Sequence, residues 1–270
     1  FGDHDSGPLR MGKGVAEILE LPTYTHIGEF QVAPTRDTTG PAFEQAERDD
    51  MITHIYHGNP GTVLDDAGNI RPEVIAAEKR GVLFDIGMGS TNFSFDIAEK
   101  AIALGLIPHI ISSDLQQFNV LGPVHSFANV MTCFLALGFD IEQIIERITI
   151  APARALHIDD HAGSLAFGMP ADVSVMTIED GDFELDDCMQ QTRKIDRQIV
   201  PVMAFKRGVR YDCDVTLARD ERNWLPMIDE DHVPQRAASL EPAQKTFLSV
   251  LGADLAQINW DETKVDIDAS

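Results

Sequence analysis

Three side chains of the kinds that bind metal ions stand at the ends of three short apolar segments. His26 lies near the end of Thr23–Phe30, His54 follows Met51-Ile52-Thr53, and Asp114 closes Ile107–Asp114. Two imidazoles and a carboxylate from separate strands suit Zn²⁺, and a catalytic zinc site keeps one position open for water. The metal lowers the pKa of that water towards neutrality, and the carboxylate can take its proton and pass it to a leaving group. The three residues therefore predict a hydrolytic metal centre.

The segments that would position these residues alternate between two types. Strands are expected at Thr23–Phe30, Met51–Thr53, Gly81–Met88 and Ile107–Asp114. Helices are expected at Leu9–Leu19, Ala42–Arg48, Pro72–Lys79, Ser94–Leu104, Ser126–Leu137, Ile141–Ile148 and Pro152–Leu156. This βα alternation is typical of a parallel sheet with crossover helices. Every expected strand delivers polar or glycine residues at its carboxyl end, where an α/β barrel keeps its active site.

The second half of the chain has a different texture. Alternating apolar residues broken by Gly and Pro after Gly163 predict a short β-hairpin, and Val200–Tyr211 predicts a strand with a turn at Lys206-Arg207-Gly208. We therefore expect three parts: a partial barrel over residues 1–158, a small β-sandwich over 159–215, and an acidic extension over 216–270 with one helix at Glu241–Leu251.

Composition limits the classes of partner. The net charge of −23 repels phosphate, so we expect no nucleic-acid partner. No window holds 18 apolar residues and no signal peptide opens the chain, so we expect no membrane partner and a cytoplasmic location. Three cysteines without CxxC spacing predict free buried thiols. The acidic run Glu179–Asp187 is interpreted as solvated surface.

Five blocks of sequence, in order, resemble the amidohydrolase superfamily, and within it the deacetylase group often described as dihydroorotase-like. The resemblance extends over roughly Gly7–Arg210, and its blocks are TYTHIGE, MITHIYHG, GVLFDIGMGSTNFSF, GLIPHIISSDLQ and GSLAFGMPADVSV. It implies a (β/α)₈ barrel with a small β-sandwich, and a site for divalent metal, zinc by preference and binuclear in the intact family. It assigns His26, His54 and Asp114 as metal ligands, with Asp114 as the proton shuttle.

The chain departs from the family pattern in two ways. No HxH motif occurs, and the carboxylated lysine of the family would lie upstream of Phe1, since Lys13 is too close to His26. We therefore expect strands 5–8 of a barrel, truncated at the amino terminus. The family also usually has histidine where Met88 and Gln116 stand, on the substrate side, so we expect these two residues to alter substrate preference.

The resemblance implies a metal-dependent hydrolase of a C–N (amide) bond, acting on a small N-acyl or N-acetyl amino-acid-like substrate. Two alternatives stay open, a non-catalytic fragment and a cyclic-amide hydrolase of the dihydroorotase type. If only these residues are present, we expect no turnover. Four strands cannot close a barrel, so we expect upstream residues, pairing into a homo-oligomer, or aggregation to cover the open edges.

Ordinary structural roles are the alternatives for individual residues. Asp114 is also a good N-cap for a following helix. His57 is interpreted as a residue of the pocket wall that contacts the substrate, and Asp85 as a residue that ties down a neighbouring loop. The remaining histidines are assigned to surface or packing positions.

Overall fold

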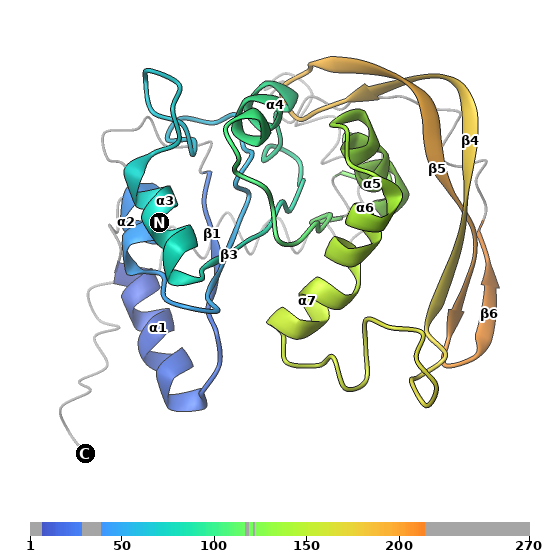
Figure 1. Ribbon diagram of the computed structural model, residues 1–270, viewed down its shortest axis with the longest axis horizontal. Helices are drawn as coiled ribbons and strands as arrows, with labels where there is room; N and C mark the ends of the chain where they lie inside the picture. The colour runs from blue at the N-terminus through green and yellow to red at the C-terminus, as the bar shows by residue number, and fades with distance from the viewer. Residues whose placement is uncertain (1–6, 29–38, 117–118, 121, 214–270) are drawn as a thin grey trace, which may run out of the picture. The chain divides into compact units, whose positions relative to one another are not determined.

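The computed structural model describes residues 7–28, 39–116, 119–120 and 122–213 (Figure 1). The chain divides into two units, Phe1–Leu225 and Pro226–Ser270, and every described residue belongs to the first. The helix expected at Glu241–Leu251 and the expected acidic extension 216–270 lie outside the described residues.

A parallel sheet carries the candidate metal ligands. Its strands are β1 (Tyr24–His26), β2 (Met51–Thr53) and β3 (Leu83–Phe84), in the order β1-β2-β3. The next extended segment joins this sheet through a parallel bridge between Asp85 and Ile110. The expected parallel arrangement is therefore confirmed. Strand β2 has the expected bounds, whereas β1 and β3 are shorter than expected, because the backbone turns to positive φ at Gly28 (+90°) and Gly87 (+46°).

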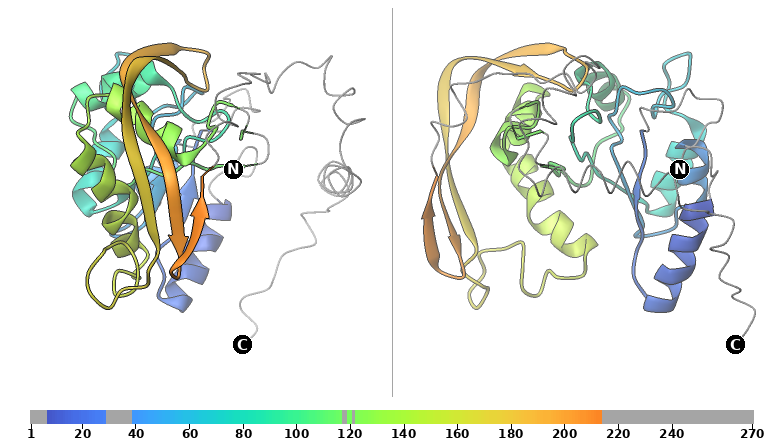
Figure 2. Two further views of the ribbon diagram at one scale, coloured as in Figure 1. Left: turned by 90° about the vertical axis from the view of Figure 1, so that its right-hand side faces the viewer. Right: turned by 180° about the vertical axis from the view of Figure 1, so that it is seen from behind.

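Seven helices are described, and most lie within a few residues of their predicted bounds. They are α1 (Gly7–Leu19), α2 (Thr39–Gln45), α3 (Pro72–Arg80), α4 (Phe95–Ala103), α5 (Phe127–Ala136), α6 (Ile141–Ile148) and α7 (Ile150–Ala155). Ser94 and Ser126 cap α4 and α5, and Asp140 forms a capping box with Gln143 at α6. Helices α1, α2 and α3 lie on one side of the parallel strands (Figures 1 and 2).

A second, antiparallel sheet follows the helices. It consists of β4 (Val173–Asp186), β5 (Thr192–Lys206) and β6 (Val209–Asp212), in that order. The predicted turn between β5 and β6 is confirmed, with Arg207 at φ +51° and Gly208 at φ +79°. One expectation needs correction, because the hairpin is long rather than short. The described residues form one three-stranded sheet here, and the expected β-sandwich over residues 159–215 stays a prediction.

The antiparallel sheet shares its core with the α/β part. Leu185, Cys188 and Ile199 belong to the same buried cluster as Phe93 and Phe134, and α5 packs on β5. The backbone N–H of Ile199 donates to the buried Thr132 Oγ1 at 3.0 Å. The hydrophobic core thus runs across residue 158, and the predicted division there stays a prediction.

One residue of the acidic run is not surface. Asp187 is fully buried, and its carboxylate accepts backbone N–H groups from Phe95, Met189 and Gln191 at 2.7–2.8 Å. It holds the first turn of α4 against the hairpin between β4 and β5, because one side chain supplies acceptors to both. The interpretation of Glu179–Asp187 as solvated surface was therefore wrong at this position.

Two remaining expectations concern cysteines and membranes. Cys133, Cys188 and Cys213 are free, as predicted, and the first two are buried while Cys213 is half-buried. Among the residues described, no helix combines the length and apolarity that crossing a bilayer demands.

Candidate metal centre

Two of the predicted ligands lie side by side at the carboxyl ends of adjacent strands. The parallel register pairs His26 with Thr53, so His54 follows directly beside His26. The imidazole rings of His26 and His54 are 4.5 Å apart between centroids and meet edge to face at 79°. His26 is exposed and His54 is buried. The strands therefore bring together the two imidazoles that sequence analysis selected.

The ring of His54 is held in one orientation. Its Nδ1 lies 2.6 Å from the carbonyl oxygen of Gly87, and a carbonyl can only accept, so Nδ1 carries the proton. The other nitrogen, Nε2, is then left with its lone pair for a cation. Burial lowers the pKa of His54, opposed by the Gly87 carbonyl and by the charge of Asp114. The ring is therefore neutral at pH 7, the form that binds metals.

Asp114 is half-buried and lies at the end of the segment that joins the sheet through the bridge between Asp85 and Ile110. Gln116 Nε2 donates to its Oδ1 at 2.8 Å, and Asn119 Nδ2 donates to its backbone carbonyl at 2.9 Å. Its φ is +46°, an uncommon conformation for a residue other than glycine and one that clusters at functional sites. The alternative role as a helix N-cap is wrong, because the next described helix, α5, is capped by Ser126.

His57 occupies the interior instead of a pocket wall. It is fully buried, and neither ring nitrogen has a hydrogen-bond partner among the described residues. A Cβ added to Gly28 would lie 2.7 Å from His57 Cγ, so the ring packs directly on that glycine. Burial, and then the nearby His54 and His26, lower the pKa of His57 to about 4. In this structure His57 is a neutral, packed imidazole and is not exposed to a substrate.

The two positions where the family usually has histidine differ in exposure. Met88 is fully buried in the hydrophobic core, so its thioether does not face a substrate here. This corrects the expectation for Met88: its side chain turns into the core cluster beneath the strand ends. Gln116 is exposed and binds Asp114, so it retains a place in the candidate site.

Within the part of the chain that the structure describes, no three His, Cys, Asp or Glu side chains form a group that could hold a metal ion. The ligand roles of His26, His54 and Asp114 therefore stay a prediction. The donor set itself fits a zinc-like cation in part, because the paired imidazoles are the ligand type that such a cation prefers. Two imidazoles leave the coordination incomplete.

Sequence analysis undervalued Asp85, which links the strand ends. Its Oδ2 accepts hydroxyl groups from Tyr24 at 2.6 Å, Thr53 at 2.5 Å and Ser112 at 2.7 Å, one from each of three neighbouring segments. The side chain is fully buried, and burial raises its pKa against the effect of these donors. The available signal was a carboxylate inside an apolar strand together with a hydroxyl residue near the end of each neighbouring segment.

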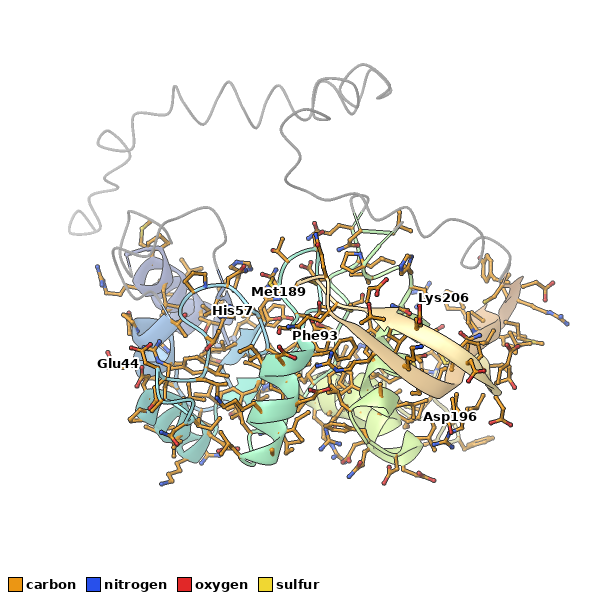
Figure 3. The ribbon with its side chains drawn as sticks, turned by 90° about the horizontal axis from the view of Figure 1, so that it is seen from above. Glu44, His57, Phe93, Met189, Asp196 and Lys206 are labelled. Atoms are coloured by element: carbon orange, nitrogen blue, oxygen red, sulfur yellow. The ribbon has the colours of Figure 1, made fainter. Side chains whose placement is uncertain are left out.

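Asn59 was missed as well. Its Nδ2 donates to the carbonyls of Gly28 at 2.8 Å and Thr91 at 3.1 Å, which joins the loops that follow β1, β2 and β3. In Figure 3, Met189 and Phe93 lie between His57 and the antiparallel sheet. A Cβ added to Gly58 would lie 2.7 Å from Met189 Cγ, so the hairpin between β4 and β5 closes over these loops.

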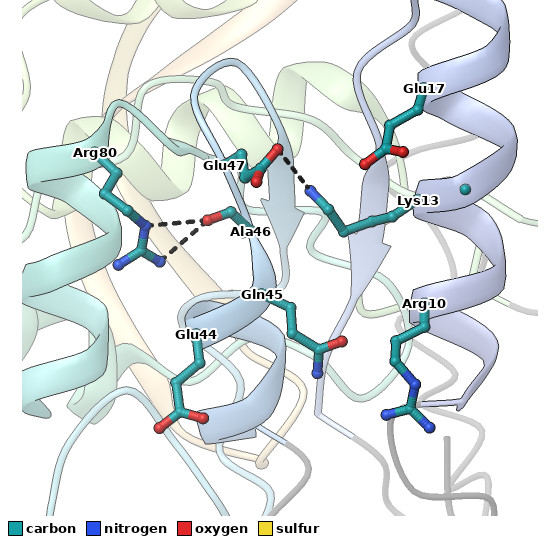
Figure 4. Close-up of a pocket in the computed structure, with 9 residues that line it drawn as sticks. Arg10, Lys13, Glu17, Glu44, Gln45, Ala46, Glu47 and Arg80 are labelled. Atoms are coloured by element: carbon teal, nitrogen blue, oxygen red, sulfur yellow. Dashed lines mark hydrogen bonds and ion pairs between the residues drawn. The ribbon is translucent and has the colours of Figure 1, made fainter.

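Lys13 is excluded from the centre, as predicted. Its Nζ lies 2.7 Å from Asp50 and 3.6 Å from Glu47, residues that precede β2 and therefore stand at the opposite end of the sheet from His54. A hollow of about 450 Å³ lies there, lined by Lys13, Arg80 and acidic residues of α1 and α2 (Figure 4). Its cations are engaged, since Arg80 also donates to the Ala46 carbonyl.

The chain is similar to proteins of known class, although no family model matches it. It is 34% identical over 215 residues to a deacetylase of Enterococcus faecalis, covering 78% of this chain and 57% of the relative. It superposes on an adenine deaminase with a TM-score of 0.72 at 33% identity, covering 78% of this chain and 56% of that one. A dihydroorotase gives 0.67 at 28% identity, with 78% and 54% covered. The chain thus spans little more than half the length of these relatives.

Proposed function

The chain belongs to the amidohydrolase superfamily, and from this premise we propose that it carries part of the active site of a metal-dependent hydrolase of an amide C–N bond. The observation that carries the proposal is the imidazole pair of His26 and His54 at adjacent strand ends, with centroids 4.5 Å apart. In a parallel sheet, the carboxyl ends of the strands are where such folds place their chemistry.

The parallel segments are proposed to be the second half of a (β/α)₈ barrel, with the antiparallel sheet as one layer of a small β-sandwich. The likeness to longer α/β relatives supports this, since the chain spans little more than half of their length. Among the described strands, β1 pairs only with β2, so its other edge is open. A closed barrel would pair that edge.

Each residue of the centre then has a role. A divalent cation, zinc by preference, supplies a water of lowered pKa when bound. His26 and His54 would hold the cation, and the Gly87 carbonyl binds His54 Nδ1–H, which leaves the lone pair of Nε2 available for it. Asp114 takes the proton of the attacking water at its carboxylate and delivers it to the leaving nitrogen. Gln116 orients that carboxylate through its bond to Oδ1.

The proposed substrate is a small N-acyl or N-acetyl amino-acid-like amide. The support is the similarity to the deacetylase of Enterococcus faecalis, which extends over 215 residues. A cyclic amide of the dihydroorotase type is the second candidate, supported by the likeness to a dihydroorotase structure. A third, a non-catalytic fragment, is favoured by the incomplete donor set among the described residues. Because we expect no turnover from these residues alone, a panel of N-acetyl amino acids and dihydroorotate assayed on a full-length homologue separates the first two.

Replacing His54 with alanine is expected to abolish zinc retention by the purified chain. Two imidazoles supply the described donors, so the loss of one leaves a single ligand and an affinity too low to survive gel filtration. Zinc per chain, measured by mass spectrometry after equilibration and gel filtration, checks this. We expect wild-type affinity to be well below that of a complete site.

His161→Ala is the matched control, because the side chain of this exposed histidine bonds only to the neighbouring Asp160 among the described residues. It removes one imidazole without touching the strand ends, so its zinc content should equal that of the wild type. Equal zinc in the wild type and in His54→Ala would overturn the assignment of His54.

A further inference from the structure

We infer that Asp85 is a positioning residue that sets the relative placement of the strand ends carrying His26, His54 and Asp114. The inference rests on the proposed function for its consequence at a metal, but its geometry stands alone. Tyr24 lies two residues before His26, Thr53 one before His54, and Ser112 two before Asp114. Asp85 binds the hydroxyl of each.

A single acceptor atom makes all three bonds. Tyr24, Thr53 and Ser112 converge on Oδ2 within 2.5–2.7 Å, and the three donors come from β1, from β2 and from the segment after α4. Hydrogen bonds that share one acceptor restrict their donors to a small common volume. The spacing of three segments is therefore set at one point, directly beneath the candidate ligands.

The other oxygen explains why a carboxyl group is required. Oδ1 of Asp85 is buried and has no hydrogen-bond partner among the described residues. Asparagine has one accepting oxygen and one NH₂ group. If the oxygen takes the place of Oδ2, the NH₂ group is buried at the Oδ1 position without an acceptor. If the amide is turned over, the NH₂ group faces three hydroxyl donors. Both arrangements loosen the common volume. The ladder of β1 and β2 near Thr25 and Ile52 would remain, because its backbone bonds do not involve Asp85.

Asp187 offers a matched control for the same chemical change. It is also a fully buried carboxylate with three donors, but these are backbone N–H groups of Phe95, Met189 and Gln191, at α4 and the hairpin. Asp187→Asn therefore changes a carboxylate that is as deeply buried as that of Asp85 but lies away from the strand ends. Any effect that appears in Asp85→Asn and not in Asp187→Asn belongs to the strand ends.

The test uses the metal-free chain and follows the imidazoles by NMR. The wild type should show a cross-peak between ring protons of His26 and His54, and the Nδ1–H tautomer of His54 in ¹⁵N spectra. Asp85→Asn should lose the cross-peak and the single tautomer, and Asp187→Asn should keep both. Thr53→Val and Ser112→Ala, each removing one donor, should weaken the cross-peak, and they decide the matter if Asp85→Asn does not fold.

A zinc titration adds the functional consequence. Zinc affinity should fall about tenfold in Asp85→Asn and remain at the wild-type value in Asp187→Asn, as outer partners of metal ligands commonly act. An unchanged cross-peak and tautomer in Asp85→Asn and both hydroxyl variants would overturn the inference. Zinc binding that does not depend on His54 would overturn the proposed function instead, while the NMR comparison still decides the role of Asp85.

Discussion

Gly87→Ala is expected to lower the free energy of unfolding by about 3 kcal/mol, the sum of a left-handed backbone penalty and of overpacking. Gly87 has φ +46°, and a Cβ there would collide with Thr53 Oγ1 and lie 2.8 Å from His54 Nδ1 and Cε1. The clash falls on the segment whose carbonyl orients His54. Urea unfolding followed by circular dichroism measures the stability, and zinc retention should fall in the same variant.

Gly105→Ala separates the two contributions. Gly105 has φ +91°, and a Cβ added there meets nothing within 4 Å, so only the backbone penalty of about 1 kcal/mol applies. Zinc retention in this variant should match the wild type. Equal losses of stability in Gly87→Ala and Gly105→Ala would contradict the packing of His54 against Gly87.

The regular elements followed from local patterns that need no distant partner. Helix α6 begins after Asp140 and ends at Ile148, as predicted, because its capping box and apolar spacing are both local. The parallel direction of β1, β2 and β3 followed from the alternation of strands and helices. The approach of His26 to His54 followed as well, since adjacent parallel strands bring their carboxyl ends together.

The hairpin of β4 and β5 was underestimated for a physical reason. Its middle carries charged residues such as Asp180 and Arg197, which pair across the strands, so the apolar alternation that predicts a strand is interrupted there. Asp187 was misjudged because its neighbours in the sequence are also acidic. A carboxylate in an acidic run is ordinarily solvated, and only the folded chain brings three backbone donors to it.

The interior of the centre depends on contacts between residues far apart in sequence. Asp85 meets Tyr24 at a separation of 61 residues and Thr53 at 32, so no local pattern could pair them. Met88 and Gln116 were grouped by their place in the motifs, yet one side chain turns into the core and the other to the surface. Both residues lie in loops beyond the strands, where the path of the backbone, which sequence spacing leaves open, decides between these outcomes.

His57 makes stability depend on pH in a direction that its burial determines. Its pKa is lowered to about 4 in the folded chain, from 6.5 for the unperturbed group. The folded chain therefore binds fewer protons than the unfolded chain between these values. The resulting stability is fully present above pH 6.5 and is lost as the pH falls to about 4, and it amounts to at most about 3 kcal/mol. Asp85, whose pKa burial raises, acts in the opposite direction at acid pH.

Comparing variants isolates the contribution of His57 from that of every other group. The free energy of unfolding is measured in urea at pH 7.5 and at pH 4.5. The loss of stability between these two pH values should be about 2–3 kcal/mol smaller in His57→Gln than in the wild type, because glutamine does not titrate. His161→Gln, at an exposed turn, should keep the wild-type difference. An unchanged pH difference in His57→Gln would show that the imidazole reaches water in the folded chain, contrary to its full burial against Gly28.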